Sequence, residues 1–199
     1  MKIGLTGSIA CGKSTVAAII RDAGFHVADA DAISRALTAP GGEALGAIRA
    51  AFGDAAFIGD VLDRRALAGI VFADEAQRER LNAILHPLII RRTMEQVAAH
   101  DAPDTLSFAD VPLLYECAMQ AQFDRVWVVS APRDVQIARL SQRDGLSEAE
   151  AAQRIDAQMP LEEKCALADA VILTDGPIEN TREQVLRLLA APGQRRQRP

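Results

Sequence analysis

Residues 7–14 read Gly-Ser-Ile-Ala-Cys-Gly-Lys-Ser and match the pattern G-x-x-x-x-G-K-[ST] at every fixed position. The segment follows a short apolar run at residues 2–6 and precedes residues 13–23, where apolar side chains recur at helical spacing. Glycines let such a loop wrap closely around a phosphate, so that its N–H groups and the helix N-terminus face the phosphate oxygens. This order of strand, glycine loop and helix predicts an α/β fold that binds a nucleotide.

Further short apolar runs along the chain alternate with helical patterns. Such runs predict a five-stranded parallel sheet that is covered by helices on both faces, a three-layer α/β architecture. The expected strands after the first are 25–28, 105–109, 126–130 and 170–173. Helices are expected at 32–37, 42–52, 64–72, 74–100 (with a break or bend at Pro87), 113–122, 133–143, 147–158 and 178–189.

The length of 199 residues favours one domain. We expect it to span residues 1–191, with a helical insertion at about 40–100, a helical lid at about 133–158 and a disordered tail at 192–199. No apolar stretch is long enough for a transmembrane helix, and Lys13 interrupts the one near the N-terminus.

Composition excludes several classes of protein. The three cysteines show neither a CxxC pattern nor Cys/His spacing, which argues against a disulfide framework and a structural zinc site and favours the reducing cytoplasm. The net charge of -5 argues against general affinity for nucleic acids or membranes, although a local basic pocket is compatible with it. A monomer or weak homo-oligomer is expected.

Each part of the glycine loop has an expected role in binding ATP. Lys13 would reach the β- and γ-phosphates, and the Ser14 hydroxyl would ligate Mg²⁺. Cys11 lies near a helix N-terminus, where a thiolate is favoured, so we expect its alkylation or oxidation to block ATP binding. The ATP-binding residues predicted in the loop are Gly7, Ala10, Cys11, Gly12, Lys13, Ser14 and Thr15.

Three carboxylates come at the ends of predicted strands. Asp29 and Asp31 follow the second strand, and Asp110 ends the third. The carboxyl ends of parallel strands meet at one edge of the sheet, beside the loop after the first strand. One carboxylate of the pair Asp29 and Asp31 can accept the proton of an acceptor hydroxyl, and the other can hold magnesium through water. Asp110 stands at the usual position of a second magnesium-side acid. The alternative for Asp31 is that it caps a helix beginning at Ala32.

Five segments resemble, in order, the dephospho-coenzyme A kinase family. They are IGLTGSIACGKST (3–15), VADADAISR (27–35), LNAILHPLI (81–89), DVPLLYE (110–116) and ADAVIL (168–173). The resemblance runs from residue 3 to about 190. It implies a P-loop kinase fold and transfer of the ATP γ-phosphoryl group to the ribose 3′-hydroxyl of dephospho-CoA, which gives CoA and ADP.

The resemblance also implies roles for individual residues. Asp31 would be the base, with Asp29 as the alternative or as a magnesium ligand, while Lys13 and Arg143 would stabilise charge on the phosphoryl group. Arg139 would serve the nucleotide side of the lid. The substrate-binding residues would be Asp31, Arg35, Arg64, His86, Pro112, Leu113 and Glu116.

Other interpretations of these residues stay open at this point. Arg139 and Arg143, one helical turn apart, could be solvated surface residues, His86 could be a packing or capping residue, and Glu116 could cap a helix. The family often has Asn-x-Gly where this chain has residues 174–176, Thr-Asp-Gly, so no adenine contact is carried over there. The rival functions are another small P-loop kinase, acting on a nucleoside, sugar or shikimate-like hydroxyl, and a nucleotide-dependent regulatory switch.

Overall fold

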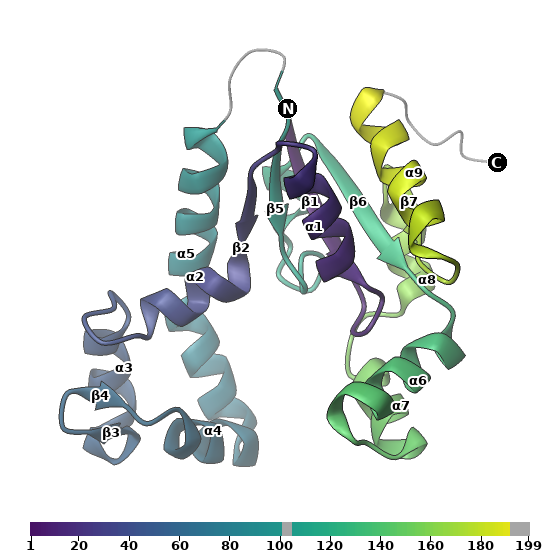
Figure 1. Ribbon diagram of the computed structural model, residues 1–199. Coiled ribbons are helices and arrows are strands. Elements are labelled where there is room, and N and C mark those ends of the chain that lie inside the picture. Colours follow the sequence, from purple (N-terminus) through teal and green to yellow (C-terminus); the bar gives the residue numbers. More distant parts are fainter. Residues whose placement is uncertain (101–104, 192–199) are drawn as a thin grey trace. The chain divides into compact units, whose positions relative to one another are not determined.

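The computed structural model describes residues 1–100 and 105–191, so the predicted tail at 192–199 lies outside the described residues. The chain divides into two compact units. The first comprises Met1–Ala28 and the described part of Gln96–Pro199, and the second comprises Asp29–Glu95 (Figure 1). Each unit is considered by itself below.

A five-stranded parallel sheet, in the order β2-β5-β1-β6-β7, organises the first unit within the described residues. Its strands are β1 (Lys2–Gly7), β2 (Val27–Asp29), β5 (Ser107–Asp110), β6 (Arg125–Ser130) and β7 (Ala170–Leu173). The register of the central strand β1 pairs Leu5 with Asp110 on one side and with Trp127 on the other. All five predicted strands are confirmed, because strands buried on both faces must be apolar throughout.

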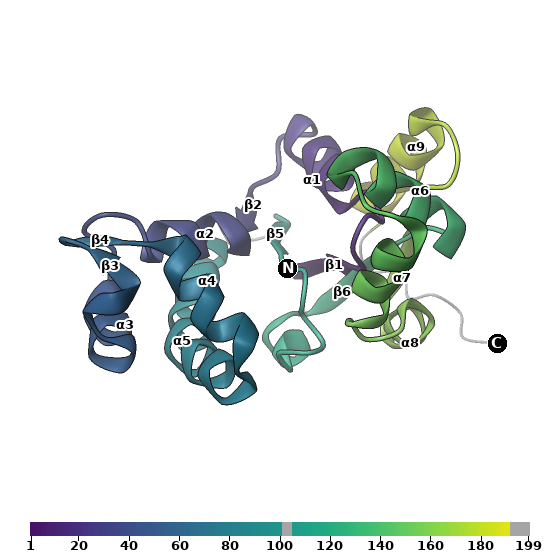
Figure 2. The ribbon, with the colours of Figure 1, turned by 90° about the horizontal axis from the view of Figure 1, so that it is seen from below.

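Helices cover both faces of this sheet. They are α1 (Lys13–Asp22), α8 (Leu161–Leu167) and α9 (Ile178–Ala190), while α6 (Arg133–Asp144) and α7 (Glu148–Asp156) pack mainly against each other. Figure 2 shows α1 and α9 on one side of the sheet and α8 on the other. Val16 and Ile20 of α1 are fully buried against Ile3 and Leu5 of β1. The three-layer α/β prediction is therefore confirmed.

The Asp29–Glu95 unit has a hydrophobic core of its own, which includes Ile33, Ile48 and Leu67. Its elements are α2 (Ala30–Leu37), α3 (Leu45–Phe52), the 3-10 helix η1 (Asp54–Ala56), the hairpin strands β3 (Phe57–Ile58) and β4 (Val61–Leu62), α4 (Arg64–Ala73) and most of α5 (Glu75–Ala99).

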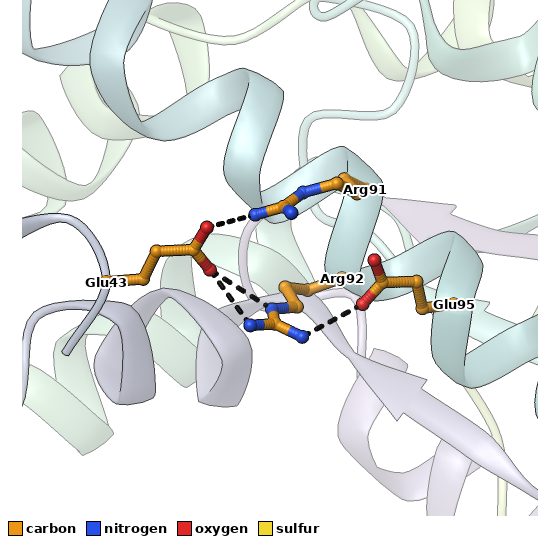
Figure 3. A network of polar contacts seen from close by, with 4 residues as sticks. All are labelled: Glu43, Arg91, Arg92 and Glu95. Atoms are coloured by element: carbon orange, nitrogen blue, oxygen red, sulfur yellow. Dashed lines mark hydrogen bonds and ion pairs between the residues drawn. The ribbon is translucent and has the colours of Figure 1, made fainter.

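A network of charged side chains fastens the loop between α2 and α3 to α5. Figure 3 shows the Glu43 carboxylate accepting from Arg91 and, at 3.0 Å, from Arg92. Arg92 also donates to Glu95 at 3.0 Å. The network lies at the surface, since these side chains are about half exposed.

Two expectations about helices are wrong, and one is wrong in part. The helix α5 continues through Pro87, so the predicted break is absent. Leu85 and Leu88 pack against the core of the unit, which offsets a cost of about 3 kcal/mol for an interior proline. Residues 113–122 form turns and a 3-10 helix, η2 (Met119–Gln122), because Ala118 has a left-handed φ of 52°. The helix α2 begins at Ala30 instead of Ala32.

No helix in the described ranges is both long and apolar enough to cross a membrane.

Candidate active site

The glycine loop joins β1 to α1 in a conformation that its sequence makes possible. A Cβ atom on Gly7 would lie 2.6 Å from the carbonyl oxygen of Val129, so only glycine fits there. Gly12 is the N-cap of α1 and has a φ of 79°. Ala10 has a φ of 62°, which costs a non-glycine residue about 1–2 kcal/mol. Other contacts must therefore hold the loop at Ala10.

Arg139 of α6 and Thr174, which follows β7, supply contacts of this kind. Arg139 donates to the carbonyl oxygen of Ala10 at 3.2 Å and to Thr174 Oγ1 at 3.1 Å. Thr174 Oγ1 in turn donates to the carbonyl oxygen of Cys11 at 2.7 Å. The interpretation of Arg139 as a solvated surface residue is therefore wrong.

A cavity of about 440 Å³ lies beside the loop. Its volume is within the range usual for small-molecule sites, about 300–1,000 Å³. It is lined by Ala10, Gly12, Ser14, Thr15, Arg139, Gln142, Arg143, Thr174, Gly176, Ile178 and Thr181. The structure thus brings together most of the side chains predicted to bind ATP, and it adds the segment at residues 174–176.

Lys13 and Asp110 form an ion pair at the carboxyl end of the central strands. Both side chains are mostly buried, with exposures of 17% for Lys13 and 11% for Asp110. The parallel register explains why the Asp110 carboxylate lies near Lys13, because Asp110 is opposite Leu5, two residues before the loop begins. The phosphates of ATP would compete with Asp110 for the Lys13 ammonium group.

The residues at this edge of the sheet fit Mg²⁺. Within the described ranges there is no group of three or more His, Cys, Asp or Glu side chains that could hold a metal ion. Mg²⁺ in kinases is usually bound through one or two protein oxygens together with phosphates and waters. Ser14, exposed at the start of α1, and the Asp110 carboxylate supply hard oxygen donors of this type.

The expectation that the Cys11 thiolate is favoured is wrong. Its side chain is 1% exposed and belongs to the hydrophobic core under the sheet. Burial raises the pKa of the Cys11 thiol above its ordinary value, and this outweighs the nearby helix N-terminus. Its N–H donates to the carbonyl oxygen of Ser8 at 3.3 Å, so the residue contributes its backbone to the loop.

The second predicted lid arginine, Arg143, lies at the last turn of α6. Its guanidinium donates to the Asp144 carboxylate at 2.8 and 2.9 Å. This pairing raises the pKa of Arg143 and lowers the pKa of Asp144. The side chain is 60% exposed and lines the cavity, so it can exchange this carboxylate for a phosphate.

The segment after β5 carries three predicted substrate residues. The carbonyl oxygen of Pro112 accepts from Thr6 Oγ1 at 3.1 Å, and Leu113 is 40% exposed. Glu116 does not cap a helix. Its carboxylate pairs with Lys164 at 2.7 Å and accepts from the N–H of Met159 at 3.2 Å.

The Asp29–Glu95 unit carries the other predicted site residues. The Asp29 carboxylate caps α2 by accepting from the N–H of Ala32 at 2.9 Å, and Asp31 is exposed in the first turn of that helix. The alternative that Asp31 is the cap is therefore wrong.

Two arginines of this unit lie close together. Arg64 donates to the carbonyl oxygen of Arg35 at 3.1 Å and to Thr38 Oγ1 at 2.7 Å. His86 is half-buried on α5.

Comparisons with known proteins agree with this geometry. The family model described as dephospho-CoA kinase matches residues 1–180. The chain is 50% identical to the dephospho-CoA kinase of Anaeromyxobacter dehalogenans, over 94% of this chain and 90% of that protein.

Solved structures share the fold of this chain. A crystal structure from Thermus thermophilus has a TM-score of 0.83 at 36% identity and covers 97% of both chains. The dephospho-CoA kinase from Campylobacter jejuni has a TM-score of 0.66 at 27% identity and covers 95% of both chains.

Proposed function

Because the chain belongs to the dephospho-CoA kinase family, we propose that it transfers the γ-phosphoryl group of ATP to the ribose 3′-hydroxyl of dephospho-CoA. The products are CoA and ADP, and the reaction is the last step of CoA biosynthesis. The observation that carries the proposal is the cavity that the glycine loop shares with Arg139 and Arg143. It offers backbone donors and two guanidiniums to a triphosphate.

Lys13 and Arg143 are the two cations that stabilise the transferred group. Each is paired with a carboxylate in the structure, Lys13 with Asp110 and Arg143 with Asp144. ATP draws both onto its phosphates, where their charge is most effective because the closed lid excludes water. The Ser14 hydroxyl and the Asp110 carboxylate would hold Mg²⁺, which would supply positive charge beside the phosphates.

Asp31 accepts the proton of the acceptor hydroxyl as the phosphoryl group transfers. Two features of α2 favour Asp31 over Asp29. The Asp29 carboxylate is already engaged as the helix cap, whereas Asp31 is exposed in the first turn. We assign Asp29 to the magnesium site, where it would hold the ion through a water molecule.

The remaining assignments concern the acceptor site, the parts of the domain that cover it, the oligomeric state and the location in the cell. Arg35, Arg64, His86, Pro112, Leu113 and Glu116 bind dephospho-CoA. The helical insertion at about 40–100 covers the acceptor, and the lid at about 133–158 closes over ATP, within one domain over residues 1–191. The enzyme is a monomer or weak homo-oligomer of the cytoplasm, where its three cysteines stay reduced.

The test is coupled ADP release with a panel of acceptors. We expect dephospho-CoA to stimulate release strongly, and adenosine, shikimate and gluconate to leave it near the rate without acceptor. A stronger response to one of the other three would identify a different small kinase. Slow turnover with every acceptor would favour a regulatory switch.

A further inference from the structure

Gln158 contacts the first turn of the phosphate loop. Its Oε1 atom accepts from the N–H of Ile9 at 2.8 Å and from the Ser8 hydroxyl at 3.0 Å. A backbone N–H can only donate, so the atom that faces Ile9 is the carboxamide oxygen. Gln158 follows the lid helix α7 (Glu148–Asp156) by two residues. The contact therefore joins the end of the lid to the loop.

The next two residues of the loop are held in the same way. Arg139 donates to the carbonyl oxygen of Ala10, and Thr174 Oγ1 donates to that of Cys11. Three consecutive residues are thus each fixed by a side chain from a different element. A left-handed non-glycine residue such as Ala10 persists only where its surroundings determine its conformation in this way.

The three side chains differ in their relation to the nucleotide. Within the described residues, Arg139 and Thr174 line the cavity of about 440 Å³ beside the loop, where ATP can compete for their contacts. Gln158 lines a separate cavity of about 450 Å³, together with Ser8. Its hydrogen bonds to the loop are therefore the ones that a bound nucleotide leaves in place.

The position of Gln158 is itself fixed. Its N–H donates to the carbonyl oxygen of Ile155, at 3.1 Å, and the next N–H, of Met159, donates to Glu116 at 3.2 Å. The Glu116 carboxylate pairs at 2.7 Å with Lys164, whose side chain is completely buried. A contact anchored in this way holds the loop in one geometry, because neither end can move freely.

We propose that Gln158 is a positioning residue for the phosphate loop. It keeps Ser8 and Ile9 in the orientation in which the loop binds the ATP phosphates. It touches no reacting group and acts only through the loop. The inference rests on the proposed binding of ATP at this loop and is independent of the acceptor.

The test replaces Gln158 by methionine, which has a similar shape and lacks the acceptor oxygen. We expect Gln158→Met to weaken MgATP binding, measured by calorimetry, by about tenfold and to lower kcat by a similar factor, since small displacements of bound groups have large effects. Gln153→Met, the same change at an exposed position of α7, is the matched control and should leave both unchanged. A lower melting temperature with unchanged MgATP affinity and kcat in the folded variant would overturn the proposal.

A second variant tests the proposal independently. Ser8→Ala removes one of the two hydrogen bonds, and we expect it to weaken MgATP binding by about two- to threefold. Added to Gln158→Met it should have no further effect, whereas added to Gln153→Met it should keep its full effect. Unchanged affinity in Ser8→Ala, or full additivity with Gln158→Met, would contradict the proposal.

The two proposals fail separately. A wild-type protein that binds MgATP without responding to dephospho-CoA would contradict the proposed function. The affinity measurements on Gln158 would remain decisive in that case.

Discussion

In the unit built on the parallel sheet, the side chains that hold the phosphate loop are buried or half-buried, and they join residues 129 to 163 positions apart. In the Asp29–Glu95 unit, the ion pairs around Glu43 and Arg49 lie at the surface, with side chains more than a third exposed. A buried polar contact enforces one geometry because an unsatisfied partner is costly, whereas an exposed ion pair is weak and exchanges with water. We infer that the unit built on the parallel sheet is rigid and that the Asp29–Glu95 unit tolerates local change.

Lys13→Met should have the largest effect on activity. The variant loses the cation at the transferred phosphates, and kcat for ADP release should fall by about 10³-fold, as for the loss of a transition-state donor. Lys2→Met, at the other end of β1, is the matched control and should keep near wild-type activity. If the kcat of Lys13→Met stayed within tenfold of the wild-type value, Lys13 would not stabilise the transferred phosphoryl group, and its assigned role would be wrong.

Glu116→Gln should have the largest effect on stability. It leaves the Lys164 charge buried without its partner, so the free energy of unfolding, measured in urea, should fall by about 3 kcal/mol. Lys164→Met should cost less, because Glu116 keeps an exposure of 24% and can be hydrated. Equal losses of the free energy of unfolding in the two variants would contradict the contrast between buried and exposed ion pairs. Losses as small as those expected for exposed ion pairs would contradict it too.

Asp31→Asn tests the assignment of the base. We expect kcat to fall by about 10²-fold with MgATP affinity nearly unchanged, which is the usual contribution of a general base. Asp29→Asn is the matched variant, because asparagine also caps helices and α2 should remain stable. A larger loss of kcat in Asp29→Asn than in Asp31→Asn would exchange the roles of the two carboxylates.

Glu43→Gln should have the smallest effect. Its hydrogen bond with Arg91, and then that with Arg92, holds the pKa of Glu43 below its ordinary value of 4.5. A carboxyl group with a lowered pKa stabilises the folded state above the unfolded pKa, and this contribution is lost as the pH falls through the folded pKa. The melting temperature of Glu43→Gln should therefore lie slightly below that of wild type at pH 7.

Two conditions should remove this difference. High salt screens exposed ion pairs, and pH values below the lowered pKa of Glu43 protonate the wild-type carboxyl group. A difference in melting temperature that persists in both conditions would mean that Glu43 acts through packing.

The sequence predicts the parts of the molecule that local patterns determine. The glycine loop, the five strands and Asp110 follow from apolar runs and from the rule that parallel strands end at one edge. Local patterns do not predict contacts between residues that are far apart in the sequence. Nothing in the spacing of Gln158 or Thr174 indicates that they contact the glycine loop. Local patterns also fail at Ala118, whose left-handed conformation ends an apparently helical segment, and at Cys11, whose burial outweighs its helix terminus.

The transfer itself is the most direct test of the account. ATP labelled in the γ-phosphoryl group should give CoA labelled at the ribose 3′-phosphate, in equal amount to the ADP released, and Asp31→Asn should lower both products together. Label that appears only as inorganic phosphate, or at another position of the acceptor, would contradict the account.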